Sequence, residues 1–257
     1  MRLRCTLVFA LAALPGSLWA QSLFDGTWII ESDATKVSDR PEMYTLDRGR
    51  FCCVQTNLSI KADGLDHKVA KGPYVDTEKV RVVDDRTVEV VVKKAGKVMF
   101  TTTFVVSEDR DKLTAATKDT TEAEAVFLET LYQRVQKGPT GAHALSGSWR
   151  GYKTKKSANG SIITYKCTDE GFSAETPLGE KYYGKFDGKF YPTEDDPGHT
   201  LAAVKRIDTN TVELTQKREG KITGVLRLTV SADGKFIHGV FERKDGVSNS
   251  FEMRKQP

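Results

Sequence analysis

The chain has 257 residues, of which 39 are Lys or Arg and 35 are Asp or Glu, so its formal net charge is +4. Basic and acidic residues are mixed along the sequence, with no block of like charge. A nucleic-acid-binding surface needs a basic stripe that releases counterions from phosphate, so this charge pattern argues against a nucleic-acid partner.

Residues 1–20 have the three parts of a secretory signal peptide: a basic start, an apolar run from Cys5 to Leu14, and a small residue at the end, Ala20. The apolar run is too short to cross a bilayer, which needs roughly 20 residues, and we expect no later membrane span. Cleavage after Ala20 leaves 237 residues, enough for one large or two small cores. We therefore predict a soluble mature protein, periplasmic or secreted; the alternative is a buried N-terminal strand.

The mature chain contains two diverged copies of one unit. At an offset of 124, residues 63–109 align without a gap with 187–233, and 14 of the 47 positions are identical. Outside that block, Gly26-Thr27-Trp28 matches Gly147-Ser148-Trp149 at an offset of 121. Because chance does not keep this order, we predict a tandem duplication. Its parts are a first copy over 21–136, a short linker over 137–144 and a second copy over 145–257.

Apolar and polar residues alternate within each copy, for example in 87–92 and 211–215, which is the pattern of half-buried strands. Glycines between such runs indicate hairpin turns, and about eight strands can be placed in each copy. We therefore predict an all-β fold of two tandem small up-and-down β-barrels. A two-sheet sandwich per copy, or two halves that complete one structure, are the alternatives. In 121–130, where the composition also suits a helix, we favour a strand from Phe127 onward.

Two Gly-x-Trp strings, ending at Trp28 and Trp149, each open a meander that closes on a strand containing Arg134 or Arg254, respectively. This pattern resembles the Gly-x-Trp motif and terminal-strand arginine of lipocalin-like (calycin) barrels. In that family the Trp plugs one end of the barrel and the Arg packs across its face. The resemblance implies that Trp28, Arg134, Trp149 and Arg254 are structural plug residues.

A closer similarity extends over nearly the whole mature chain. The strings over 61–66, 82–89 and 204–213 are similar to a group of exported bacterial lipocalin-like proteins of unknown function. That group has no assigned activity to transfer, so the similarity supports the fold and the compartment and leaves the function open.

Three cysteines remain after cleavage, namely Cys52, Cys53 and Cys167. An odd number in an oxidising compartment allows one disulfide and one leftover thiol. Cys52 and Cys53 are neighbours in an expected strand, so their side chains point to opposite faces, and either one could pair with Cys167 to join the two copies. The alternative is that all three are free thiols that pack as small hydrophobic side chains.

The sequence carries no signature of catalysis or of metal binding. Its four histidines lack metal-ligand spacing, and it contains no Cys-x-x-Cys, His-Glu-x-x-His or nucleophile-elbow string. We expect no metal, no cofactor and no catalytic residue, and the ligand-binding residues stay unassigned.

By analogy with the fold, the sequence predicts an exported, non-enzymatic binding protein for a small apolar or amphipathic ligand. One alternative is a structural or partner-binding envelope module with filled barrels, its partner unknown. The other is an enzyme that uses an acid or a histidine at a barrel mouth.

Residue sizes suggest which copy would hold the ligand. Gly224 stands where the first copy has Phe100, and Thr223 stands where it has Met99. A barrel of about eight strands is just wide enough either to be filled by side chains or to hold one small ligand. We therefore predict the larger cavity in the second copy. The same division predicts that fragments 21–138 and 142–257 each fold alone.

Overall fold

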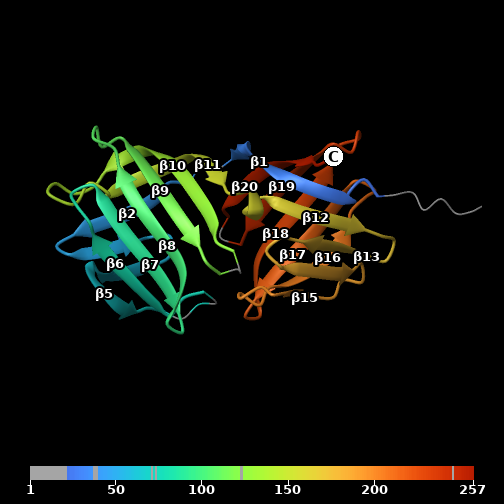
Figure 1. Cartoon of the computed structure of the whole chain (residues 1–257), viewed down its shortest axis with the longest axis horizontal. Coiled ribbons are helices and arrows are strands. Elements are labelled where there is room, and N and C mark those ends of the chain that lie inside the picture. The colour runs from blue at the N-terminus through green and yellow to red at the C-terminus, as the bar shows by residue number, and fades with distance from the viewer. Residues whose placement is uncertain (1–21, 37–39, 71, 73, 122–123, 245) are drawn as a thin grey trace, which may run out of the picture.

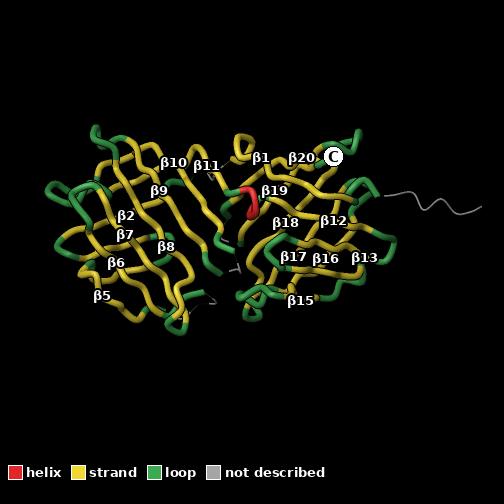
Figure 2. Tube along the Cα trace, viewed as in Figure 1, coloured by secondary structure: helices red, strands yellow, loops and turns green. Residues whose placement is uncertain are grey.

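The computed structural model describes residues 22–36, 40–70, 72, 74–121, 124–244 and 246–257. Its strands form two ten-stranded antiparallel sheets, each curled into a barrel (Figure 1). The described chain is almost entirely strand, with one short 3-10 helix, η1 (Ala158–Gly160) (Figure 2). The all-β prediction of two tandem barrels is confirmed, although each has ten strands where the pattern indicated about eight. The predicted signal peptide, 1–20, lies outside the described residues.

One continuous stretch of chain, residues 42–156, builds the first barrel. Its strands follow the order β4-β3-β2-β11-β10-β9-β8-β7-β6-β5. The edge strands β4 and β5 follow one another with only Ala62 between them, so the sheet returns on itself there. Its strands are β2 (Glu42–Asp47), β3 (Arg50–Cys53), β4 (Leu58–Lys61), β5 (Asp63–Lys68), β6 (Thr77–Val82), β7 (Thr87–Lys94), β8 (Lys97–Val106), β9 (Lys112–Asp119), β10 (Val126–Lys137) and β11 (Gly147–Lys156).

The second barrel combines the N-terminal strand with the C-terminal part of the chain. Its ladder is closed in the order β1-β12-β13-β14-β15-β16-β17-β18-β19-β20, with β20 pairing back to β1. Its strands are β1 (Gly26–Lys36), β12 (Ile162–Cys167), β13 (Gly171–Glu175), β14 (Lys181–Lys185), β15 (Tyr191–Glu194), β16 (Leu201–Arg206), β17 (Thr211–Arg218), β18 (Lys221–Val230), β19 (Phe236–Arg243) and β20 (Ser248–Lys255).

The first strand of each predicted copy lies in the other copy's barrel. β1 pairs with β12 and β20, whereas β11 pairs with β10 and β2. The barrels therefore do not follow the division into 21–136 and 145–257. The predicted linker 137–144 is also wrong, because it belongs to the hairpin between β10 and β11 inside the first barrel, where Gly138 N donates to Ser146 O. The chain instead passes between the barrels after β1 and after β11.

The two ladders match position by position, which lets residues of one barrel be compared with those of the other. Trp149 pairs with Glu42 as Trp28 pairs with Ile163. Residues at the same place in the two ladders are called counterparts below. A buried cluster fills the middle of each barrel, with Trp149 in the first and Trp28 in the second. β10 begins at Val126, so the strand expected from Phe127 onward is confirmed.

Candidate functional site

Trp149 closes one end of the first barrel, and its side chain is fully buried. The indole Nε1 donates to the carbonyl of Leu145 at 2.8 Å, and the Arg134 guanidinium lies 3.8 Å above the ring. The Arg134 Nη atoms donate to the carbonyls of Ser146 and Ala144. Gly147 is required beside them, since its φ is +135° and an added Cβ would lie 2.3 Å from the Gln136 carbonyl. Arg134 therefore packs on the Trp of the second copy.

Trp28 closes the second barrel in the same way, with its Nε1 donating to Phe24 O at 2.8 Å. The cation above this ring is Lys255, whose Nζ lies 5.3 Å from the ring centre. Arg254 lies on the outer face, where its Nε donates to Glu31 and its side chain is 56 % exposed. The expectation that Arg254 is a plug residue is wrong, because it is one residue out of register and a slip of one residue moves a side chain to the opposite face of a strand.

The three described cysteines are free thiols. Cys52 and Cys53 lie on β3 of the first barrel and Cys167 on β12 of the second. The possible disulfide between the copies is therefore not formed, and the alternative of packed thiols describes Cys53 and Cys167, whereas Cys52 is only half-buried. Cys53 and Cys167 are buried within the two clusters and contribute apolar surface to them.

Inside the first barrel, two tyrosines converge on one carboxylate. The hydroxyls of Tyr44 and Tyr132 donate to the two oxygens of Glu42, the Tyr132 bond measuring 3.3 Å. Both tyrosines are buried, and this burial, together with the charge of Glu42, raises the pKa of each phenol above its ordinary value. The phenols therefore stay neutral at physiological pH and hold the Glu42 carboxylate in a fixed position.

Further polar residues extend this interior toward the end of the barrel away from Trp149. Thr102 and Thr117 share a hydrogen bond of 2.9 Å, and Thr130 and Thr154 share one of 3.3 Å. Glu78 lies two residues before the fully buried Val80 and therefore also faces inward, and burial raises the pKa of its carboxyl. We call these residues the polar layer: Glu42, Glu78, Thr102, Thr117, Thr130 and Thr154.

The second barrel has larger apolar side chains at most of the counterpart positions. The counterparts of Glu42, Glu78, Thr102, Thr117 and Thr130 in the second barrel are, in that order, Ile163, Ala202, Leu226, Phe241 and Phe251. An added Cβ on Gly224 would lie 2.6 Å from the Phe241 ring, and one on Gly239 would lie 2.2 Å from the Phe251 ring. The expectation that Gly224 opens a cavity in the second copy is therefore wrong, because an aromatic ring from the neighbouring strand fills the space.

The two barrels meet beside the polar end of the first one. The Tyr74 hydroxyl donates to Asp196 Oδ1 at 2.7 Å, and the buried Asp196 also accepts the backbone N–H groups of Gly198 and Thr200. A hollow of about 260 Å³ opens at this junction. Its walls come from both barrels, with Phe100, Asp119 and Lys156 on one side and Leu178, Glu180 and Pro197 on the other.

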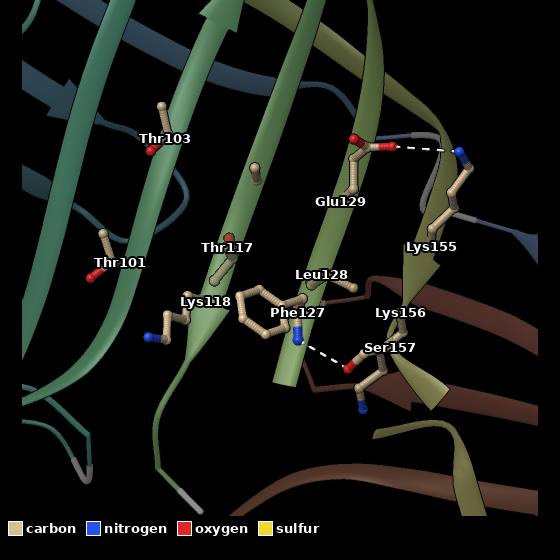
Figure 3. A pocket seen from close by; sticks show the side chains of 11 residues that line it. Thr101, Thr103, Thr117, Lys118, Phe127, Leu128, Glu129, Lys155, Lys156 and Ser157 are labelled. Carbon is tan, nitrogen blue, oxygen red and sulfur yellow. Dashed lines mark hydrogen bonds and ion pairs between the residues drawn. The ribbon is translucent and has the colours of Figure 1, made fainter. Parts of the chain in front are cut away.

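A second hollow, of about 590 Å³, lies on the outer face of the first barrel across β8 to β11. Figure 3 shows its lining: Thr101 and Thr103 on one side, the Phe127 ring in the middle, and the Glu129–Lys155 ion pair of 3.6 Å at the far edge. Phe127 is 57 % exposed. This outer groove lies on the opposite face of the sheet from most of the polar layer, although Thr117 also belongs to its lining.

No family model, curated protein or solved structure matches this chain. The described residues contain no group of three or more His, Cys, Asp or Glu side chains placed to hold a metal ion. None of the helical structure in the described part of the chain is long and apolar enough to cross a membrane.

Sequence reasoning missed Glu42, Tyr44 and Tyr132. A signal was present, because Glu42 and Tyr44 are two residues apart in Glu-Met-Tyr-Thr-Leu-Asp and therefore share a strand face with Leu46. That alternation places a carboxylate on the face of a core leucine, but it does not reveal the partner on β10.

Proposed function

We propose that the protein is an exported, non-enzymatic binding protein that holds a small amphipathic ligand at the polar layer of the first barrel. One observation supports this choice of barrel. Four threonines and two carboxylates occupy inward positions of the first barrel, where the second barrel has two phenylalanines, a leucine and an isoleucine among their counterparts. Ligand sites combine apolar walls with a few polar groups that fix orientation, and the first barrel has both.

The charge of the polar layer indicates the ligand's head group. The Glu42 carboxylate accepts hydrogen bonds from two neutral phenols, and the Glu78 carboxyl makes no hydrogen bond or ion pair with the described residues. Glu42 and Glu78 are half-buried, and carboxylates withdrawn from water are costly without a cation or several donors, so the complementary ligand brings an amine or another strong donor. Its apolar body would pack against Val92 and Phe104, which lie beside the polar layer on β7 and β8.

The test converts the first barrel's interior into that of the second. The pair Ala115–Thr130 occupies the ladder position of Gly239–Phe251, so the double variant Ala115→Gly, Thr130→Phe recreates a ring packed over a glycine. Binding of an environment-sensitive apolar dye to the full chain should fall at least tenfold, because the new ring occupies the ligand's space. Dodecylamine should displace the dye from the parent more strongly than dodecanoate does.

A matched control lies one residue along the same strands. Ala116→Gly, Glu129→Phe changes the outward-facing pair of the same ladder, in the outer groove. Dye binding that survives the inner variant and disappears in the outer one would place the ligand on the groove and overturn the proposal. Equal displacement by the amine and the acid would contradict the role of Glu42 and Glu78.

The other parts of the proposal have their own tests. Export follows from the predicted signal peptide, and mass spectrometry of protein from its own source should find Gln21, or a residue close to it, as the N-terminus. A structural or partner-binding role is the rival, and the filled interior of the second barrel favours it for that barrel. Absence of any co-purified small molecule in a native mass spectrum would favour the structural or partner-binding role over ligand binding.

A further inference from the structure

The rim of the second barrel gathers positive charge around a hollow of about 440 Å³. Its described lining consists of Gln216, Arg218, Thr223, Phe241, Arg243 and Lys244, and three of these six described residues are cationic. Gln216 follows the buried Leu214 by two residues, and Phe241 and Arg243 follow the buried Gly239 by two and four residues. The side chains of Gln216, Phe241 and Arg243 therefore lie on the inner side of the rim.

Arg218 is held in place by neutral groups. Its Nε donates to Thr200 Oγ1 at 2.7 Å, and its guanidinium lies 5.4 Å from the centre of the Tyr74 ring. Neither Arg218 nor Lys244 forms an ion pair with a carboxylate of the described residues. A guanidinium fixed in this way has its Nη donors available, and three cations around one hollow favour an anion with several oxygens.

The first barrel is different at the same place. The counterparts of Phe241 and Arg243 are Thr117 and Asp119, and that of Gln216 is Val92, whereas Arg218 has the cationic counterpart Lys94. The first barrel therefore has an acid where the second has Arg243, and it lacks the ring of Phe241. We propose that this rim binds the phosphate group of a small organic phosphate, with Arg218, Arg243 and Lys244 on the phosphate oxygens and Phe241 against the organic part. Arg218 packs on Tyr74 of the other barrel, so this side of the rim lies at the junction between the barrels.

Titration calorimetry on the full chain tests the proposal, with inorganic phosphate and phenyl phosphate as ligands at about 50 and 200 mM salt. The double variant Arg243→Gln, Lys244→Gln should weaken both ligands by about tenfold or more, because each lost cation removes a charge-assisted hydrogen bond. Both side chains are exposed, so the variant should keep the parent's melting temperature. Phenyl phosphate should bind more tightly than inorganic phosphate, because its ring adds contact with Phe241.

The matched control is Lys205→Gln, Lys235→Gln, which removes two exposed cations of the same barrel away from the rim. Its affinity should equal that of the parent. Equal weakening by both pairs would show diffuse charge attraction and overturn the site, as would unchanged affinity in the rim variant. Binding to phosphatidic acid vesicles without binding to either free ligand would assign the rim to a lipid surface and would also overturn the proposal.

Discussion

Trp28 and Trp149 are the largest fully buried side chains of the described residues, and each makes one indole hydrogen bond to a carbonyl four residues earlier. Replacing a buried aromatic by alanine leaves a cavity that the surrounding barrel cannot close. We expect Trp28→Ala and Trp149→Ala each to lower the free energy of unfolding by about 3–5 kcal/mol, measured by urea denaturation. A melting temperature within a degree or two of the parent would show that the Trp concerned is not a plug.

The two terminal-strand arginines should differ in their effect on stability. Arg134→Gln loses the contact with the Trp149 ring and weakens three bonds to carbonyls, so it should cost about 1–2 kcal/mol. Arg254→Gln loses only an exposed ion pair and should stay within about 0.5 kcal/mol of the parent. Paired urea titrations would measure both changes, and a large effect of Arg254→Gln would contradict its outward position.

The plug tryptophans could be found from the sequence because Gly-x-Trp is a local signal. The cation that covers Trp28 could not be assigned correctly, because aligning 131–134 with 251–254 uses an offset of 120. The ladders place Tyr132 with Met253 and Arg134 with Lys255, which is the offset of 121 already seen at the two tryptophans. Sequence identity at one arginine outweighed the register, and in a strand the register decides which face a residue occupies.

At the scale of elements, the exchange of β1 and β11 changes which fragments can fold. Residues 40–160 contain all ten strands of the first barrel, whereas 21–138 lacks β11 and with it Trp149. We expect fragment 40–160 to give a β-type circular dichroism spectrum with a cooperative melt. Fragment 21–138 should melt at a clearly lower temperature or without cooperativity. The earlier expectation that 21–138 and 142–257 are independent units would be restored if both melted like the parent.

Alternation and turn glycines were sufficient to predict the strands, because both are properties of neighbouring residues. The exchange depends on long-range pairing, and the two Gly-x-Trp strands are so alike that either could complete either barrel. Both strands place a tryptophan beside β12 or β2 in the same register. The alternation of apolar and polar residues in a strand indicates which face is buried, but it does not indicate which strand lies beside it. The strand order could therefore not be predicted from the sequence.

At the scale of the whole molecule, the two barrels have matching hydrogen-bond ladders and differ in the side chains that they enclose. The first has a carboxylate held by Tyr44 and Tyr132, and the second has aromatic rings over Gly224 and Gly239. Their rims differ as well, since Asp119 and Arg243 are counterparts. The same strand arrangement therefore supports two barrel ends of different charge and polarity, which is consistent with two different ligands and with a fold that does not determine function by itself.

The junction between the barrels gives a dependence of stability on pH. Burial alone would raise the pKa of Asp196, but hydrogen bonds from Thr200 and Tyr74 hold it below its ordinary value. The unfolded chain therefore binds the proton more readily than the folded chain does. The stabilisation by Asp196 is complete above the unfolded pKa of about 3.9 and is lost as the pH falls through the folded pKa. The junction should accordingly weaken in acid.

Asp196→Asn and Tyr74→Phe test this directly. At pH 6 each should lower the free energy of unfolding, Tyr74→Phe by about 1–2 kcal/mol, since it removes one hydrogen bond to a charged group. At pH 2 the difference between Asp196→Asn and the parent should shrink, because the parent's carboxyl is then protonated as well. Urea titrations across this range, with Asp195→Asn as the control at the neighbouring exposed acid, measure the effect. A constant difference between Asp196→Asn and the parent from pH 6 to pH 2 would show that the charge of Asp196 does not stabilise the junction.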